Sequence, residues 1–420
     1  MSTTQGTRGP KKASVTMYNV GFGDCFLLSF EYARGKVRRV LIDCGSKTST
    51  TAQMTKVVDQ VVSDSGGRVD ALVVTHRHLD HLSAFGAKGL GEKLEGLKPA
   101  LVIQPWTEHP KADKAALEAP TVFTKQALRH LTGLVAAQEF ATRLVRNPGQ
   151  LLAAAGPGTQ KELTAIAALS IPNEPAVKRI EQMKARHAYV HAGSASGLET
   201  LLPGVKVTVL GPPTLKQADT IRRQTRWDDD EFWKLRVRLS AACGANLTTK
   251  RGSSVLFRGA ETDSVARAPS YVRWMVKKLD EAQLLQAKEI VRSLDDALNN
   301  TSVILLFEFG GKALLFPGDA QLESWQYALS DPKTASRLKK VTVYKVGHHG
   351  SANATPKSLW KLLPGRGAKR QRLVTLLSTK KGAHAGVPNA TLVEALGDES
   401  ELHSTEGNGR TVRWSFDVRP

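Results

Sequence analysis

The segment that most constrains this chain runs from Val73 to His81 and reads Val-Val-Thr-His-Arg-His-Leu-Asp-His. It follows an apolar run from Val69 to Thr75, whose length and β-branched character predict a buried strand. Histidine is uncommon, at 11 of 420 residues, so three histidines in six positions indicate a metal site. Because four ligands exceed what one catalytic metal with an open position takes from protein, we interpret the segment as part of a two-metal site. The predicted ligands are His76, His78, Asp80 and His81.

Two later strands end in groups that could complete such a site. The apolar run Leu314–Phe316 leads into Pro317, Gly318 and Asp319, and a carboxylate at a strand end can bridge two cations. The run Val341–Val346 leads into two histidines between glycines. Of these, we expect His348 to be a metal ligand, whereas His349 could bind substrate, assist catalysis or simply be packed.

Other polar residues are candidates for supporting this site. Asp43 ends a predicted strand and could accept the second ring N–H of a ligating histidine, which would fix its tautomer. Asp24 could act in the same way or hold its turn. His384 follows the predicted strand Leu373–Ser378 and could reach the mouth of the site. The candidate catalytic residues are Asp80, His349 and His384.

The organisation of the chain predicts one α/β domain. Residues 1–14 are polar and are expected to form a disordered leader, and residues 15–420 to form a sheet-rich core. Two segments with helical character, at about 109–195 and 214–298, are expected to interrupt this core. No apolar run approaches the roughly 18 residues of a spanning helix, and three scattered cysteines fit a reduced environment, so a cytoplasmic, membrane-free protein is expected.

Positive charge is concentrated in one part of the chain. The net charge is +20, and residues 332–381 contain thirteen Lys or Arg and no Asp or Glu. Such a segment indicates a surface suited to polyphosphate, so nucleic acid, DNA or RNA, is the expected partner. The residues predicted to contact its backbone are Lys345, Lys357, Lys369, Arg370 and Arg372.

The order of these motifs resembles the metallo-β-lactamase fold superfamily. The matching pieces begin at Leu41-Ile-Asp-Cys-Gly45 and continue with the histidine segment, Phe316-Pro-Gly-Asp319 and Lys345-Val-Gly-His-His-Gly-Ser351. The opening Tyr18-Asn-Val-Gly-Phe-Gly-Asp24, together with Asn299–Ile304, is more narrowly similar to the hydrolase domain of ComEC-type DNA-uptake proteins. The similarity covers roughly residues 15–105, 203–213 and 300–415.

This resemblance implies a four-layer αββα sandwich, here with two mostly helical insertions, and two divalent metals, zinc or manganese, at one edge. It implies that His76 and His78 hold the first metal, that Asp80, His81 and His348 hold the second, and that Asp319 bridges them. Family members also supply a third histidine to the first metal, whereas this chain has Asn299, Asn300 and Thr301 at that place. An asparagine carbonyl, a water or another histidine such as His191 could substitute, so Asn300 is expected beside the site.

These expectations lead to a hypothesis of function with two alternatives. A hydroxide between two cations could attack a phosphodiester, which makes a DNA or RNA phosphodiesterase the main hypothesis. A hydrolase of a small ester, lactone, thioester or nucleotide is the first alternative. A non-catalytic, metal-loaded module that binds nucleic acid is the second.

Overall fold

The computed structural model describes residues 9–109, 173–214, 217, 298–368, 371–384, 386–406 and 411–418. The chain divides into two compact units. The first comprises Met1–Val122, Pro172–Ile221 and Leu298–Pro420, and the second comprises Phe123–Ile171 and Arg222–Ala297. Since the second unit lies outside the described residues, the fold below is that of the first unit.

Seven strands form the first sheet, in the order β13-β1-β2-β3-β4-β5-β6. The strands from β13 to β3 are antiparallel to their neighbours, and those from β3 to β6 run parallel. Central strands of this sheet are almost wholly apolar, as expected for strands covered on both faces. The bounds are β1 Lys12–Met17, β2 Phe26–Glu31, β3 Val37–Ile42, β4 Ala71–Val73, β5 Leu101–Pro105, β6 Arg186–Val190 and β13 Val412–Asp417.

Six strands form the second sheet, in the order β12-β11-β10-β9-β8-β7. Here β7, β8 and β9 are antiparallel, whereas β9 to β12 run parallel. The bounds are β7 Lys206–Gly211, β8 Ile304–Phe309, β9 Lys312–Phe316, β10 Val343–Lys345, β11 Val374–Leu377 and β12 Glu401–Ser404.

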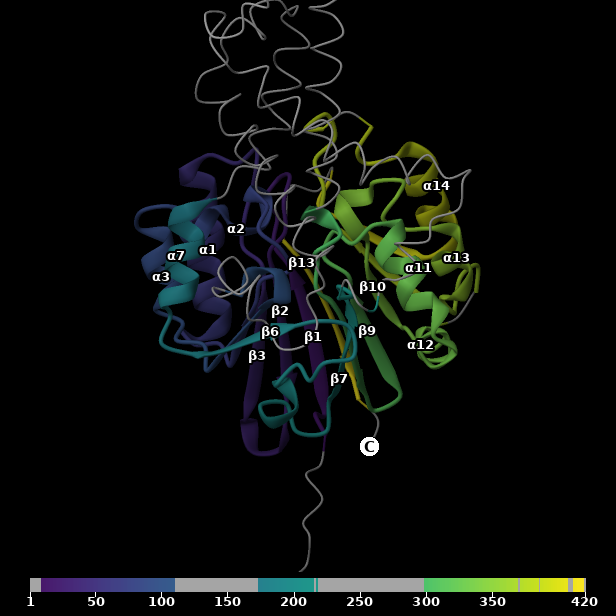
Figure 1. The fold of residues 1–420 in the computed structure, drawn as a ribbon, viewed down its shortest axis with the longest axis horizontal. Coiled ribbons are helices and arrows are strands. Elements are labelled where there is room, and N and C mark those ends of the chain that lie inside the picture. The colour runs from purple at the N-terminus through teal and green to yellow at the C-terminus, as the bar shows by residue number, and fades with distance from the viewer. Residues whose placement is uncertain are drawn as a thin grey trace, which may run out of the picture. The chain divides into compact units, whose positions relative to one another are not determined.

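Helices cover the outer face of each sheet (Figure 1). On the first sheet lie α1 Thr51–Ser65, α2 Leu79–Gly86, α3 Leu90–Glu95 and α7 Glu174–Gln182. On the second lie α11 Leu322–Ser330, α12 Pro332–Leu338, α13 Lys357–Leu362 and α14 Ala390–Glu399. Short 3₁₀ turns occupy η1 Ala33–Gly35, η2 Trp106–Glu108, η3 Leu198–Thr200 and η5 Gly347–Gly350.

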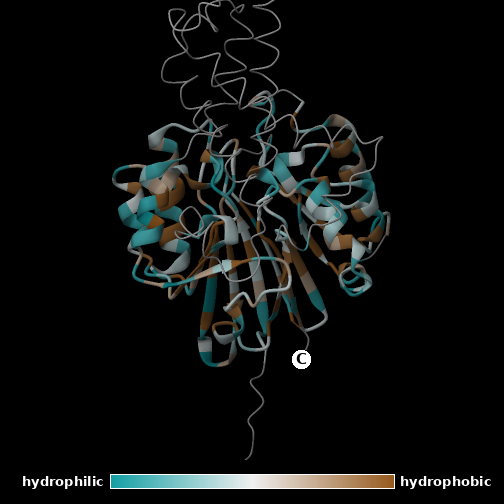
Figure 2. Cartoon of the chain, viewed as in Figure 1, coloured by the Kyte–Doolittle hydropathy of each residue, from teal (hydrophilic) through white to brown (hydrophobic). Residues whose placement is uncertain are grey.

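Three apolar clusters hold these four layers together. The central cluster joins the facing sides of the two sheets, for example where the rings of Phe26 and Phe316 meet edge to face with centroids 5.6 Å apart. The other two clusters join each sheet to its helices, so hydrophobic residues line the strands and the inner helix faces (Figure 2). This arrangement confirms the predicted four-layer αββα sandwich.

Two predicted boundaries differ from the structure. Strand β1 begins at Lys12, inside the predicted leader, because it pairs with both β2 and β13. The first predicted insertion extends too far, since α7 and β6 lie within it and belong to the core. Nearly all of the second predicted insertion, at about 214–298, lies outside the described residues. Among the described helices, none is both long enough and apolar enough to cross a membrane.

Parallel strands bring the polar segments to one edge. Strands β3 and β4 in the first sheet, and β9, β10 and β11 in the second, each run into a segment that was predicted to carry site residues. Because the carboxyl ends of parallel strands lie at the same edge of a sheet, these segments converge there. We call this edge the carboxyl edge.

Close backbone packing supports the histidine segment at this edge. A Cβ atom added at Gly45 would lie 2.5 Å from the backbone carbon of His81 and 2.6 Å from that of Asp80. These atoms are backbone, which cannot rotate away as a flexible side chain could. Gly45 therefore allows the segment after β3 to lie directly against the start of α2.

We predict that Gly45→Ala destabilises the protein by about 1–3 kcal/mol, because the added methyl group forces that backbone apart. Gly397→Ala is the matched control: it lies in α14 with no atom within 4 Å of the added Cβ. The control should leave stability unchanged or raise it by up to about 1 kcal/mol. Urea unfolding of both variants measures this, and equal stabilities would contradict the prediction.

Candidate metal centre

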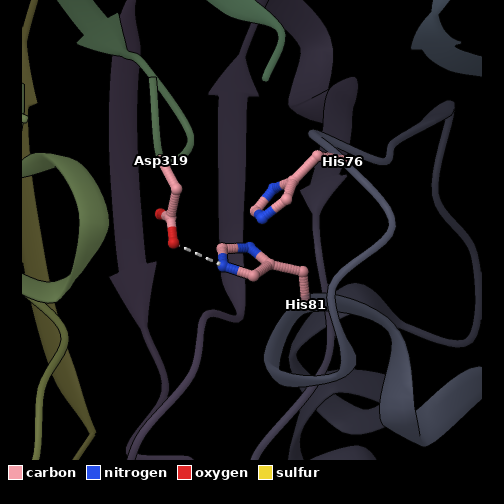
Figure 3. A group of neighbouring side chains, drawn as sticks. All are labelled: His76, His81 and Asp319. Carbon is pink, nitrogen blue, oxygen red and sulfur yellow. Dashed lines mark hydrogen bonds and ion pairs between the residues drawn. The ribbon is translucent and has the colours of Figure 1, made fainter. Parts of the chain in front are cut away.

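The histidine segment places its ligands on a strand end and on the first turn of a helix. His76 is the third residue after β4, whereas Asp80 and His81 lie in the first turn of α2. All three side chains are buried. His76, His81 and Asp319 each present one ligand atom, and these atoms all lie within 4.8 Å of one another (Figure 3). Asp319 comes from the segment after β9, so the group joins the two sheets.

A second group of ligand atoms shares His81 with the first. It consists of Asp80, His81 and His349, again within 4.8 Å of one another. The Nε2 atom of His349 lies 3.2 Å from Oδ2 of Asp80 and 3.4 Å from Oδ2 of Asp319. Two overlapping groups of buried nitrogen and carboxylate atoms are what a two-metal site requires.

Asp43 and Thr75 orient the ring of His81. The Nδ1 atom of His81 lies 2.8 Å from Oδ2 of Asp43, and its Nε2 atom lies 3.1 Å from Oδ2 of Asp319. Asp43 also accepts hydrogen bonds from the Thr75 backbone N–H at 2.8 Å and from the Thr75 hydroxyl at 2.6 Å. A proton on Nδ1 directed at Asp43 leaves Nε2 as the nitrogen that can bind a metal. Asp43 therefore occupies the supporting position predicted for it, and Thr75 is a support that the sequence analysis missed.

His76 and His78 face each other at the same edge. Nε2 of His76 lies 3.0 Å from Nδ1 of His78. Two ligands of one tetrahedral zinc lie about 3.3 Å apart, given zinc–nitrogen distances near 2.0–2.1 Å, so this spacing fits a shared metal. Asn299, which is buried, interacts with the His78 side chain. It lies near the place where the resemblance expects a third histidine.

The structure places the two neighbouring histidines differently relative to the other ligand atoms. His349, not His348, belongs to the group with Asp80 and His81. The Nδ1 atom of His349 lies 3.1 Å from the carbonyl oxygen of Ser378, to which it can donate, and this leaves Nε2 directed at the carboxylates. His348 is half-buried and lies outside these groups, so its role as the ligand of the second metal stays a prediction, with His349 as the residue that the geometry favours.

Backbone strain is concentrated at this site. Six described residues other than glycine have positive φ angles, and three of them are Asp43, His348 and His349 at 55°, 44° and 52°. Such conformations cost about 1–3 kcal/mol each and persist where surrounding structure holds them. We infer that the fold sustains this strain because it directs the side chains of these residues toward the site.

The protonation states suit metal binding by some of these histidines. Burial lowers the pKa of His78 to about 4, and loss of water around the ring nitrogens of His348, whose Nδ1 atom is buried although the residue is half-exposed, lowers the pKa of His348 to about 4, so both rings are neutral at pH 7. Burial also lowers the pKa of His81, but the carboxylates of Asp319 and Asp43 outweigh it and raise this pKa above its ordinary value. A protonated His81 is one way to balance those carboxylates, and a bound cation is another.

Several buried atoms at the site have no hydrogen bond of ordinary geometry. They include Nε2 of His349, Oδ1 of Asp80 and Nδ1 of His348. Buried polar atoms are almost always paired, and an unpaired group costs free energy unless an ion or water satisfies it. Because the unpaired atoms of His349 and Asp80 are a nitrogen and a carboxylate oxygen in one converging group, the residues present fit divalent metals such as zinc or manganese.

Lys345 is placed differently from its prediction as a contact for nucleic acid. Its side chain is only 2% exposed, and its ammonium nitrogen lies 2.5 Å from Oδ2 of Asp24 and 3.2 Å from Oδ1 of Asp319. The prediction is wrong because a buried ammonium held by two carboxylates cannot also bind a phosphate backbone on the surface. A lone lysine in the apolar run Val341–Val346 was the signal in the sequence.

The contacts of Asn300 and His384 show where these two predicted site residues lie. The side chain of Asn300 donates to Glu323 and accepts from the backbone N–H of Gln321, so it holds the start of α11. Its predicted place beside the metals is therefore corrected to Asn299. His384 stacks on Phe22 with ring centroids 6.3 Å apart, and Phe22 in turn lies 4.4 Å from the His349 ring. His384 is thus one ring removed from the ligand group.

The basic segment is divided between two edges of the second sheet. Arg372 comes two residues before β11, so it lies at the amino edge, away from the site, where it donates to the carbonyl oxygen of Asp398. Its predicted contact with a nucleic-acid backbone stays a prediction, and such a contact would lie away from the metal ligands. Arg337 and Arg366 pair with Glu308 and Glu399 from outside the segment.

Further lysines and arginines of the basic segment lie either at the carboxyl edge or outside the described residues. Lys357 is exposed and begins α13, and helices that follow parallel strands begin at the carboxyl edge. Lys380 and Lys381 follow β11 and lie at the same edge. Lys369 and Arg370 lie outside the described residues.

Comparison with known families agrees with this geometry over part of the chain. Residues 18–88 match the sequence model of the Metallo-beta-lactamase superfamily. The match includes Asp24, Asp43 and the histidine segment, and ends before the segments that carry Asp319 and His349. No curated protein matches the chain significantly. The superfamily consists mostly of hydrolases that use divalent metals, so a metal-dependent hydrolase is supported, while the narrower likeness to ComEC-type domains stays a prediction.

We predict that His349→Ala lowers metal content to about one ion or less per chain, because it removes a nitrogen from the ligand group. His348→Ala is the matched neighbour and should retain most of the metal bound by the original protein. Elemental analysis of both variants after loading with Mn²⁺ or Zn²⁺ and desalting measures this. Greater metal loss in His348→Ala would restore the assignment made from the sequence.

Proposed function

We propose that this protein is a phosphodiesterase that uses two divalent metals and acts on DNA or RNA. The observation that carries the proposal is the pair of overlapping ligand groups, which meet at the same edge as Lys357, Lys380 and Lys381. A phosphodiester carries a negative charge, so a polyanionic substrate suits an edge that combines metals with lysines.

The ligand groups suggest how the residues divide between the metals. His76 and His78 would hold one ion, while Asp80 and His349 would hold the other. His81 belongs to both groups. Asp319 belongs to the first group and lies next to His349 of the second, so it would bridge the ions. When bound, the two ions would supply Lewis acidity for the phosphoryl oxygens and a nucleophilic hydroxide at neutral pH.

The remaining residues position these groups and handle the leaving oxygen. Asp43 holds the His81 ring, and the carbonyl of Ser378 holds the His349 ring, so both Nε2 atoms keep their direction. With His349 assigned to metal binding, His384 is the remaining predicted residue for proton transfer to the leaving alkoxide. Proton transfer by a positioned side chain typically raises the reaction rate about 10²–10⁴-fold.

A polar cavity beside the site supports an extended substrate. Its volume is about 540 Å³, within the range of ligand pockets, and loop residues 18–24 connect it to the ligand group. It is lined by segments that follow β1, β11 and β12 and by the start of α1, all at the carboxyl edge. Lys56 and Lys380 line its wall together with Glu406, and the two lysines could hold a phosphate backbone.

We predict that Asp80→Ala lowers hydrolysis of bis(p-nitrophenyl) phosphate and of nucleic acid at least 100-fold in the presence of Mn²⁺ or Zn²⁺, because it removes a ligand. Removal of metal by a chelator should abolish both activities, and added metal should restore them. The exposed Asp398→Ala is the control and should keep full activity. Equal residual activity in Asp80→Ala would show that a contaminant is responsible.

We predict that Lys380→Glu weakens binding of DNA or RNA. The slope of the logarithm of the binding constant against the logarithm of the salt concentration should become less steep by about one, which corresponds to the loss of one phosphate contact. Lys339→Glu changes the charge equally but lies before β10, at the amino edge, so it should bind like the unmodified protein. Both variants should hydrolyse bis(p-nitrophenyl) phosphate normally. If neither variant affects polymer binding while a small ester is turned over independently of salt, the substrate is a small molecule.

A further inference from the structure

Lys345 is the last residue of β10, and its buried ammonium group has a complete set of acceptors. The nitrogen lies 2.9 Å from the carbonyl oxygen of Gly318, in addition to its contacts with Asp24 and Asp319. An ammonium group has three protons, so these three acceptors satisfy it. Lys345 is therefore held within the site and does not reach into solvent.

The contacts of Asp319 divide its carboxylate between two surroundings. Oδ1 faces the ammonium of Lys345, whereas Oδ2 faces Nε2 of His81 at 3.1 Å and Nε2 of His349 at 3.4 Å. Only one of its oxygens therefore points directly at the ligand nitrogens. Oδ2 of Asp24 likewise faces the ammonium, 2.5 Å from it.

Buried carboxylates outnumber buried lysines around the ligand groups in the described part of the chain. Four buried carboxylates lie around His81 and His349, and they belong to Asp24, Asp43, Asp80 and Asp319. Lys345 is the buried lysine that contacts two of them. Electrostatic interactions between charges a few ångströms apart are strong where water is excluded, so one buried cation affects how tightly others bind.

We propose that Lys345 is a positioning residue that acts as a fixed internal cation and sets the affinity of the site for divalent metals. It holds Oδ1 of Asp319 away from the ligand group and neutralises Asp24. As a result, the bound metals balance fewer carboxylates than the site contains. This inference rests on the proposed metal site, and it adds the control of metal affinity by a residue that is not itself a ligand.

A merely structural ion pair would behave differently. Loss of such a pair would destabilise the metal-free and metal-loaded protein to the same extent and leave metal affinity unchanged. A fixed cation that opposes metal binding would, when removed, destabilise mainly the metal-free protein. Metal affinity and the rise in Tm upon metal binding distinguish these roles without a measurement of turnover.

The test is Mn²⁺ binding to the metal-stripped full-length chain, measured by calorimetric titration in four variants. Lys345→Met removes the cation, Asp24→Asn removes one carboxylate, and the double variant removes both. Lys339→Met is the control for loss of a surface lysine at the amino edge. The Tm of each variant is measured with and without Mn²⁺.

The proposal predicts that affinity follows the local charge. Lys345→Met should bind Mn²⁺ at least about tenfold more tightly than the unmodified protein and gain more Tm upon binding. Asp24→Asn should bind more weakly, and the double variant should return to near the original affinity. If Lys345→Met does not fold, the double variant must still bind at least tenfold more tightly than Asp24→Asn.

Two results are distinguishable as failures. Unchanged or weaker binding after loss of Lys345, in a protein whose original form binds Mn²⁺, would overturn this inference and leave the proposed function standing. If the original protein binds neither Mn²⁺ nor Zn²⁺, the proposed function itself fails.

Discussion

The carboxylate of Asp43 is the interaction on which the geometry of the site depends. It accepts hydrogen bonds from the backbone and hydroxyl of Thr75 and pairs with Nδ1 of His81, so it connects the ends of β3 and β4 with the first turn of α2. These contacts direct Nε2 of His81 across the gap between the sheets toward Asp319. Because Asp43 has a positive φ angle, the backbone after β3 is itself adapted to this contact. The oriented imidazole of His81 is therefore one of the contacts that join the two sheets at the site, beside those of Lys345 with Asp24 and of His349 with Asp80.

Charge balance explains why so many polar groups can be buried together. Carboxylates taken out of water are costly unless cations or hydrogen-bond donors accompany them. Lys345, the donors around Asp43 and the imidazoles of His81 and His349 supply part of this compensation. The buried atoms that have no hydrogen bond, among them Nε2 of His349 and Oδ1 of Asp80, mark where a divalent cation fits.

Much of the fold and part of the site could be predicted from local sequence. The apolar strands around Val73, Leu315 and Tyr344 were recognisable because short apolar runs end at glycine or at polar residues. The boundary at β6 was missed because Arg186–Val190 has little apolar character and belongs to the sheet only through its pairing with β5. The sequence favoured His348 over His349 as a ligand without a physical basis, since the directions of adjacent side chains depend on backbone angles that the sequence does not display.

The sequence by itself determined the chemistry: imidazoles and carboxylates at successive strand ends, in a spacing suited to two metals, together with a basic segment. Tertiary structure decided which of these groups face one another. It placed Lys345 within the site and Arg372 at the opposite edge, although both had been predicted as contacts for nucleic acid. The physical reason is that strand direction assigns each flanking residue to one edge of the sheet, while burial decides whether a charge meets solvent or another charge.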